Sequence, residues 1–173
     1  CHEVARGLKM PTAKDREKRQ SIIDACRSMN ALGINQGTSG NISLRHGEGL
    51  LITPTSTPYE AMQPEQIVFM GLDGSHDPAQ RPSSEWRFHL DILKARPEIN
   101  AVVHAHPTYS TILAIMNLEI PPIHYMIACT GGDTIRVAPY ATFGTQELSE
   151  HAVRALEGRL ACLLEHHGMI AVG

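Results

Sequence analysis

The stretch AVVHAHPTYS, residues 101–110, joins an apolar run to two histidines separated by one residue, and a proline ends the run. This pattern predicts a buried strand over 101–106 and then a helix from about 108 to 116. Alternate residues of a strand point to the same face, so His104 and His106 should lie side by side. They are either two ligands of one metal ion or hydrogen-bonded histidines at a strand end.

Apolar periodicity and turn residues divide the rest of the chain into short elements. Helices are expected over 14–32, 82–97 and 145–158, and Ser83 or Ser84 should cap the second of them. Strands are expected over 41–45, 50–53, 65–70 and, as a strand–turn–strand unit, 161–173; extended chain is expected over 120–133 and 134–142. Hairpins with interspersed helices predict a mixed, largely antiparallel central sheet flanked by helices, an α/β fold in three layers.

Length and composition fit one domain with its own hydrophobic core, since 42% of the 173 residues are hydrophobic. We expect an N-terminal extension over 1–13 and the domain over 14–173. The sequence stops in what reads as the middle of a strand, so a C-terminal part is expected to be missing.

Charge and cysteine content narrow the partners and the compartment. The net charge is −3 and no basic stripe is present, which argues against nucleic acid. No window approaches the roughly 20 apolar residues of a membrane span. The four cysteines form no C-x-x-C pair, and we expect reduced thiols and a cytoplasmic location.

A third metal ligand is available in the turn HHG at 166–168, which joins two apolar strands. His167 is the better candidate, and His166 should point away from it. Three neutral imidazoles leave a bound ion its full charge and an open position, as in catalytic zinc sites. Taken alone, HHG is more typical of a plain turn histidine than of a metal ligand.

Two further segments have a structural and a functional interpretation. Ser83, Ser84 and Glu85 are either an ordinary helix cap or an anion site with a carboxylate beside it. The turn GTSGN at 37–41 is either a strand-entry loop or a phosphate-binding nest. It lacks the lysine of a P-loop, which disfavours a nucleoside triphosphate.

Six strings, taken together and in order, resemble the class II aldolase/adducin family. They are GTSGNISLR, ITPTSTPYE, PSSEWRFHLDILKARPEINAVVHAH, IHYMIACTGG, APYATFGT and LLEHHGMIAV. Each is weak alone, but six in register are specific, and the resemblance covers roughly residues 15–173.

The resemblance implies roles for individual residues. His104, His106 and His167 match the zinc-binding histidines, with one divalent ion per chain, and Glu85 matches the catalytic acid/base carboxylate. Tyr125 is expected near the chemistry or in the core. The positions that match the phosphate-binding residues are Gly40, Asn41, Thr55, Ser56, Ser83 and Ser84. The family also implies a homotetramer with active sites at subunit interfaces.

The implied activity is cleavage of a ketose 1-phosphate, of the fuculose 1-phosphate type, into dihydroxyacetone phosphate and an aldehyde. A divalent ion would stabilise the enediolate, so no lysine Schiff base is needed. Alternatives are an epimerase, dehydratase or decarboxylase of the same family, a non-catalytic adducin-type interaction module, or a zinc hydrolase. Two features depart from the family pattern: Ser56 replaces a glycine, and a C-terminal segment that supplies a tyrosine is absent.

Overall fold

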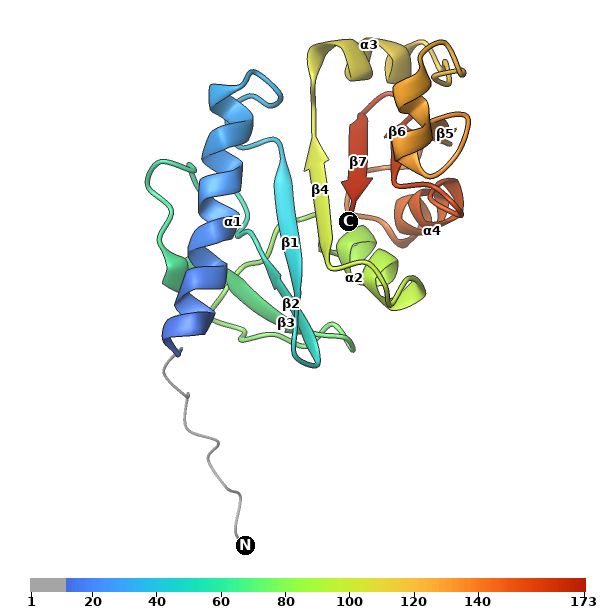
Figure 1. Cartoon of the computed structure of the whole chain (residues 1–173). Coiled ribbons are helices and arrows are strands. Elements are labelled where there is room, and N and C mark those ends of the chain that lie inside the picture. Colours follow the sequence, from blue (N-terminus) through green and yellow to red (C-terminus); the bar gives the residue numbers. More distant parts are fainter. Residues whose placement is uncertain (1–11) are drawn as a thin grey trace, which may run out of the picture.

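The structure is a computed structural model that describes residues 12–173 (Figure 1). Its α-helices are α1 (Ala13–Ala31), α2 (Trp86–Ala95), α3 (Thr108–Ile115) and α4 (Gln146–Ala155), and its 3₁₀ helices are η1 (Pro64–Gln66) and η2 (Tyr125–Thr130). Thr12 begins α1, because its side chain accepts a hydrogen bond from the Asp15 backbone N–H at 3.2 Å. The expected extension over 1–13 therefore lies almost wholly outside the described residues.

Seven strands form one sheet in the order β3-β2-β1-β4-β7-β6-β5. They are β1 (Asn41–His46), β2 (Gly49–Ile52), β3 (Val68–Gly71), β4 (Ala101–Ala105), β5 (Arg136–Ala138), β6 (Ala161–Leu164) and β7 (Gly168–Val172). Neighbouring strands are antiparallel except β5 and β6, which are parallel. The expected mixed, largely antiparallel sheet is confirmed. No helix within residues 12–173 is long and apolar enough to cross a bilayer.

Each face of the sheet has its own apolar core. Helices α2 and α4 pack on one face, where Phe88 and Leu93 meet strand residues such as Val102 and Ile170. Helix α1 packs on the other face, over the β1–β3 half (Figure 1). The period-2 alternation of the strands explains this division, because neighbours such as Val102 and Val103 join opposite clusters.

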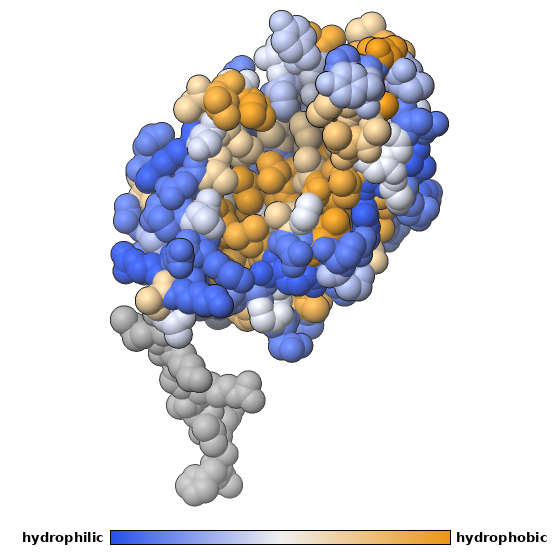
Figure 2. Space-filling view, in the orientation of Figure 1, coloured by the Kyte–Doolittle hydropathy of each residue, from blue (hydrophilic) through white to orange (hydrophobic). Residues whose placement is uncertain are grey.

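The α1 face is less covered over the other half of the sheet. Val103 pairs with Ala171 and Ala105 with Met169, and three of these four side chains are only half-buried. Figure 2 shows apolar side chains at the bottom of a hollow between the polar surface of α1 and the far half of the molecule. Strand β4 is the middle strand of the sheet, between β1 and β7, and it lies beside this hollow (Figure 1).

Most expected elements are present, and three expectations were wrong in detail. The strand expected over 65–70 begins only at Val68, because η1 occupies the residues before it. The segment 120–133 is not extended throughout: η2 forms within it and ends at Gly131, which has a φ of 86°. Its apolar residues suit a strand or a helix equally, so the pattern does not decide between them. The third correction concerns the start of α2, described with the site below.

Candidate active site

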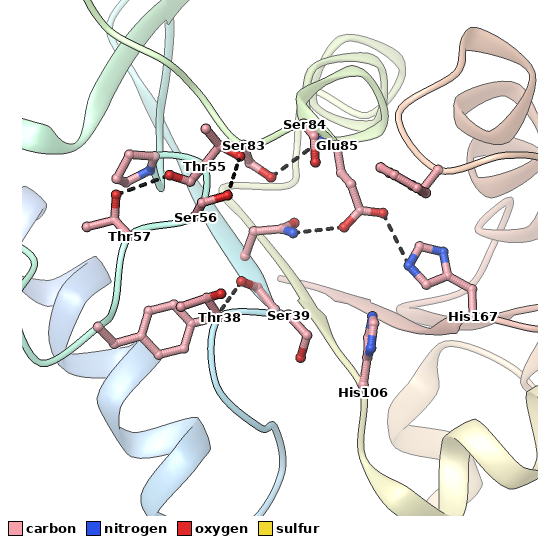
Figure 3. Close-up of a pocket in the computed structure, with 15 residues that line it drawn as sticks. Thr38, Ser39, Thr55, Ser56, Thr57, Ser83, Ser84, Glu85, His106 and His167 are labelled. Atoms are coloured by element: carbon pink, nitrogen blue, oxygen red, sulfur yellow. Dashed lines mark hydrogen bonds and ion pairs between the residues drawn. The ribbon is translucent and has the colours of Figure 1, made fainter.

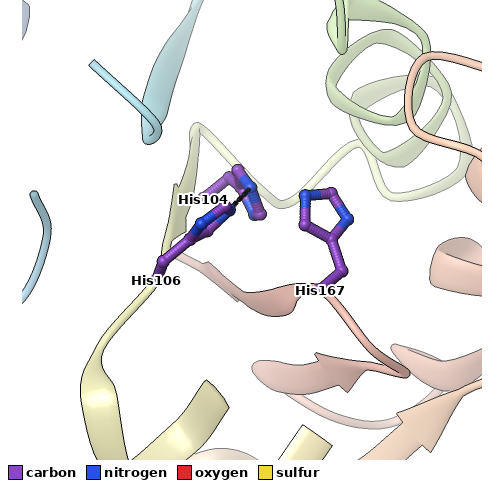
Figure 4. Close-up of side chains that lie close together, drawn as sticks. All are labelled: His104, His106 and His167. Atoms are coloured by element: carbon purple, nitrogen blue, oxygen red, sulfur yellow. Dashed lines mark hydrogen bonds between the residues drawn. The ribbon is translucent and has the colours of Figure 1, made fainter. Parts of the chain in front are cut away.

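The three histidines singled out by sequence come together at the ends of β4 and β7 (Figure 4). His104 lies in β4, His106 immediately follows β4, and His167 lies in the turn before β7. Their ligand atoms all lie within 4.8 Å of one another. His104 Nε2 and His106 Nε2 are 2.9 Å apart. The side-by-side placement expected for i and i+2 strand residues is thus what the structure has.

Hydrogen bonds outside the cluster fix how these rings present their nitrogens. His104 Nδ1 lies 2.9 Å from the Met169 carbonyl oxygen, which can only accept. The proton of His104 therefore sits on Nδ1, and the Nε2 lone pair faces the other rings, as in the outer shell of zinc histidines. The backbone N–H of His106 donates to Asn35 Oδ1 at 3.2 Å.

Two glycines make room for the cluster. A Cβ on Gly168 would stand 2.7 Å from His106 Cδ2, and a Cβ on Gly40 would stand 2.7 Å from the His104 carbonyl oxygen. Both contacts are closer than real Cβ atoms tolerate. Gly168 is therefore required for space rather than for flexibility in the turn. His166 has a φ of 55° and its ring is turned away, as expected.

Burial keeps the three imidazoles neutral. It lowers the pKa of His104 to about 3 and that of His167 to about 4, and it lowers the pKa of His106 as well. Neutral imidazole is the form that binds metal. Three neutral rings with converging nitrogens are the donor set of a catalytic zinc site, so these residues fit a divalent ion.

Glu85 lies close to His106 and His167, with its carboxylate turned towards them (Figure 3). Its side chain is buried, with Oε2 3.3 Å from His104 Nε2 and Oε1 3.3 Å from His167 Nε2. Asn41 Nδ2 donates to Oε2 at 2.9 Å, whereas Oε1 is buried without a hydrogen-bond partner. Burial raises the pKa of Glu85, and His167 and the Asn41 hydrogen bond partly offset this. A carboxyl of raised pKa with a free oxygen is suited to carrying a proton.

The start of α2 corrects the expected serine cap. The helix begins at Trp86, so Glu85 occupies the N-cap position rather than the first turn, and it makes no side-chain capping bond. The Ser83 N–H donates to the Thr53 carbonyl at 2.9 Å, which holds the chain against the end of β2. Ser83 Oγ instead accepts from the Glu85 N–H at 3.3 Å. The contact between Ser83 and Thr53 is long-range and cannot be predicted from the local sequence. With the chain held there, α2 begins only at Trp86, and Glu85 points towards the histidines.

A cavity of about 370 Å³ opens beside these groups (Figure 3). One side, the histidine wall, consists of His106, His167 and Glu85, together with His104 directly behind them. The opposite side, the hydroxyl wall, consists of Thr38, Ser39, Thr55, Ser56, Ser83 and Ser84. The hydroxyls and the start of α2 together suit an anion such as phosphate.

The cavity gathers nearly all of the residues predicted from sequence. Its lining includes Gly40, Asn41, Thr55, Ser56, Ser83, Ser84, Glu85, His106 and His167, and His104 lies behind them. Tyr125 is not brought there: it lies on η2, is 80% exposed and stacks on His124. Ser56 has a φ of 52°, a conformation that favours glycine, which explains why a glycine fits this position.

Sequence reasoning did not single out Tyr59 or Asn35. Tyr59 lines the cavity, and its hydroxyl donates to the Gly40 carbonyl. Asn35 Oδ1 accepts from Ser39 Oγ at 3.0 Å as well as from the His106 backbone. Asn35 lies next to the turn at 37–41, but a single asparagine in a loop carries no pattern that separates it from an ordinary turn residue.

Comparison with known proteins agrees with the site. The profile described as "Class II Aldolase and Adducin N-terminal domain" matches residues 20–173. The chain is 54% identical over 155 residues to the 5-methylthioribulose-1-phosphate/5-deoxyribulose-1-phosphate aldolase of Rhodospirillum rubrum, covering 90% of this chain and 70% of that protein. It is 55% identical over 152 residues to the L-fuculose phosphate aldolase of Escherichia coli, covering 88% and 71%.

Among solved structures, an L-fuculose 1-phosphate aldolase superposes with a TM-score of 0.89 at 36% identity, covering 96% of this chain and 78% of the other. Fold, cavity and relatives therefore define an enzyme of the lyase class with a candidate metal site. The chain belongs to the class II aldolase and adducin family.

Proposed function

We propose that the chain is a zinc-dependent aldolase that cleaves a ketose 1-phosphate into dihydroxyacetone phosphate and an aldehyde. One observation carries this proposal: Glu85, whose unpartnered Oε1 lies 3.3 Å from a histidine of the candidate metal site, lines a cavity whose other wall is suited to phosphate. The acid/base candidate Glu85, the candidate metal ligands and the proposed anion site thus belong to one cavity. An interaction module would need none of them.

The hydroxyl wall, Glu85 and the three histidines would each have a separate role in the reaction. The hydroxyl wall would bind the phosphate and place the substrate with the bond to be broken beside Glu85. Cleavage turns the hydroxyl of the aldehyde half into a carbonyl and would release its proton to solvent, while the electron pair stays on the dihydroxyacetone phosphate half. The Glu85 carboxyl would then give its proton to that carbon. A divalent ion on the three histidines would supply electrophilic stabilisation of the enediolate. The raised pKa of Glu85 supports this role, because a carboxyl must be protonated to act as the acid.

Tyr125 and the exposed apolar surface around it support assembly. Tyr125 lies outside the cavity of its own chain, and exposed apolar side chains on α3 and η2 include Tyr109, Ile112 and Met126. Such a patch is typical of a subunit interface. We propose a homotetramer in which Tyr125 reaches the active site of a neighbouring chain.

Mixing two inactive variants tests this arrangement. If Tyr125 acts across the interface, Tyr125→Phe and Glu85→Gln protein, mixed and allowed to exchange subunits, should recover part of the turnover that neither has alone. Light scattering should give four chains per particle. A monomer, or no recovery in an exchanged mixture, would contradict the assembly proposal.

Substrate choice is tested with a panel of ketose 1-phosphates. The zinc-loaded protein is incubated with fuculose 1-phosphate, ribulose 1-phosphate and 5-methylthioribulose 1-phosphate, and dihydroxyacetone phosphate is measured by a coupled assay. At least one should yield it, since the named relatives are aldolases for sugars of this kind. If none does, and an epimer or a dehydrated product forms instead, the aldolase proposal is wrong. The enzyme is proposed to act in the cytoplasm, which the buried, unpaired Cys26 and Cys162 support.

A further inference from the structure

A continuous chain of buried hydrogen bonds ends on Glu85. Ser43 Oγ lies 2.8 Å from His89 Nδ1, and His89 Nε2 lies 2.5 Å from Asn41 Oδ1. Asn41 Nδ2 then donates to Glu85 Oε2 at 2.9 Å. His89 comes from α2 and its ring is fully buried, while Ser43 and Asn41 are neighbours on one face of β1.

The polarity of this chain is determined at its Glu85 end. The free Oε1 is the oxygen that carries the proton when Glu85 is protonated, so Oε2 only accepts, and Asn41 must turn its NH₂ group towards Glu85 and its carbonyl oxygen towards His89. His89 Nε2 must then carry the proton, and Nδ1 is left to accept from the Ser43 hydroxyl. In this arrangement Ser43 Oγ, both ring nitrogens of His89 and both the oxygen and the nitrogen of the Asn41 amide have a partner. The opposite tautomer of His89 would set a lone pair against the Asn41 oxygen.

The chain of hydrogen bonds also fixes the orientation of the Asn41 side-chain amide. With no partner for its oxygen, the Asn41 amide could turn over and place that oxygen against the Glu85 carboxylate, which would repel it. His89 prevents this from a position that does not line the cavity. A fully buried histidine is costly unless its ring is hydrogen-bonded, and this one is bonded on both nitrogens. Burial lowers its pKa, which keeps the ring neutral and able to accept from Ser43.

We propose that His89 is a positioning residue for the proton transfer at Glu85, acting by locking the orientation of the Asn41 amide. This rests on the proposed role of Glu85. It predicts that changes at His89 lower turnover without weakening substrate binding or metal binding. A histidine that only fills the core would affect stability instead.

Two substitutions of similar size separate these roles. The amide nitrogen of His89→Gln can replace Nε2 and donate to Asn41, whereas that of His89→Asn reaches only the Nδ1 position. We expect His89→Asn to lower kcat on the order of 10- to 100-fold, with KM and metal content per chain within about twofold of the wild type. His89→Gln should recover most of the loss.

The control is Ser149→Ala. Ser149 is fully buried on α4 and its hydroxyl donates to Asp91 of α2 at 2.7 Å, so its loss disturbs the same helix away from Glu85. It should lower the melting temperature and leave kcat unchanged. Equal loss of kcat in His89→Gln and His89→Asn, or unchanged kcat in both, would overturn the inference.

A double variant links the effect to Glu85. If His89 acts through Glu85, adding His89→Asn to Glu85→Gln should cause no further loss in the residual rate of proton exchange at dihydroxyacetone phosphate, measured by NMR in deuterated water. An undiminished extra loss would overturn the inference. Full turnover in Glu85→Gln alone would instead refute the proposed function, so the two failures are distinguishable.

Discussion

The histidine wall and the hydroxyl wall face each other across one cavity but are built differently. The histidine wall stands on the ends of β4 and β7 and the start of α2. His104 and Glu85 are buried, and the Met169 carbonyl and Asn41 hold them in place. The hydroxyl wall stands on loops, and Ser39, Ser56 and Ser84 are exposed. Rigid elements hold the side chains whose positions must be precise, whereas loops hold hydroxyls that would bind an anion through several hydrogen bonds together. Disturbing the first wall should therefore abolish chemistry, and disturbing the second should weaken binding.

The largest effect is expected for His104→Ala. It removes the most buried ligand, so the metal content should fall from about one ion per chain to nearly none, and turnover with it. His166→Ala is the matched control, because it removes a histidine next to the candidate ligand His167 whose own ring is exposed. Metal analysis checks both. Full metal content in His104→Ala would show that the histidine wall does not bind the ion.

Glu85→Gln should separate metal binding from catalysis. The amide has nearly the same shape but cannot carry the proton, so kcat should fall about 10²- to 10⁴-fold while the metal stays bound. Glu157→Gln, on the exposed surface, should leave kcat at the wild-type value. Steady-state kinetics with the best substrate of the panel gives both numbers. An unchanged kcat in Glu85→Gln would remove this residue from the mechanism.

The hydroxyl wall should respond in KM. Ser84→Ala removes a hydroxyl from the cavity lining without removing a bond to Glu85. Because a hydrogen bond to a charged group contributes about 1.5–3 kcal/mol, KM should rise about 10-fold or more while kcat changes little. Thr55→Val should behave in the same way. A fall in kcat at constant KM would mean that this wall takes part in the chemistry.

The two walls should also differ in their response to acid. His104 and His167 have folded-state pKa values of about 3 and about 4, below the ordinary 6.5. At a pH between these folded-state pKa values and 6.5, the unfolded chain binds more protons than the folded one. The free energy of unfolding should therefore fall as the pH drops from about 6.5 towards 4. Urea unfolding of the metal-free protein at several pH values measures the slope. His104→Ala should flatten it, and Ser84→Ala should leave it as it is.

The smallest effect is expected for Ser56→Gly. Ser56 has a φ of 52°, where a side chain is strained and glycine is not. The substitution should raise the free energy of unfolding by less than about 1 kcal/mol, because the added flexibility of the unfolded chain offsets part of the gain. Ser84→Gly, at ordinary φ, should destabilise instead. A loss of stability in Ser56→Gly would show that its side chain does more than tolerate the turn.

The sequence predicts some features of the histidine wall and not others. His104 and His106 follow from strand alternation, and His167 from a turn between two apolar runs, because these are local patterns. The orientation of Glu85 does not follow, since it depends on Ser83 bonding to Thr53, thirty residues earlier in the chain. The link between His89 and Asn41 spans 48 residues and has no local signature either.

The helix η2 shows the same limit in the fold. The apolar string IHYMIACT suits a strand, a buried helix or an exposed interface equally. The sheet order that leaves this string outside the strands is set by pairings between distant segments, such as β4 with β7. Elements with one clear period, such as α1, and hairpins with a short turn, such as β1–β2, were predictable for the opposite reason.

The most direct test is a crystal structure of the zinc-loaded protein with dihydroxyacetone phosphate, with anomalous data collected at the zinc edge. One anomalous peak should lie about 2.0–2.1 Å from a nitrogen of each of His104, His106 and His167. The phosphate should lie on the hydroxyl wall, beside Ser83 and Ser84. A peak elsewhere, or a phosphate bound away from this wall, would contradict the assignment of metal and substrate to opposite sides of one cavity.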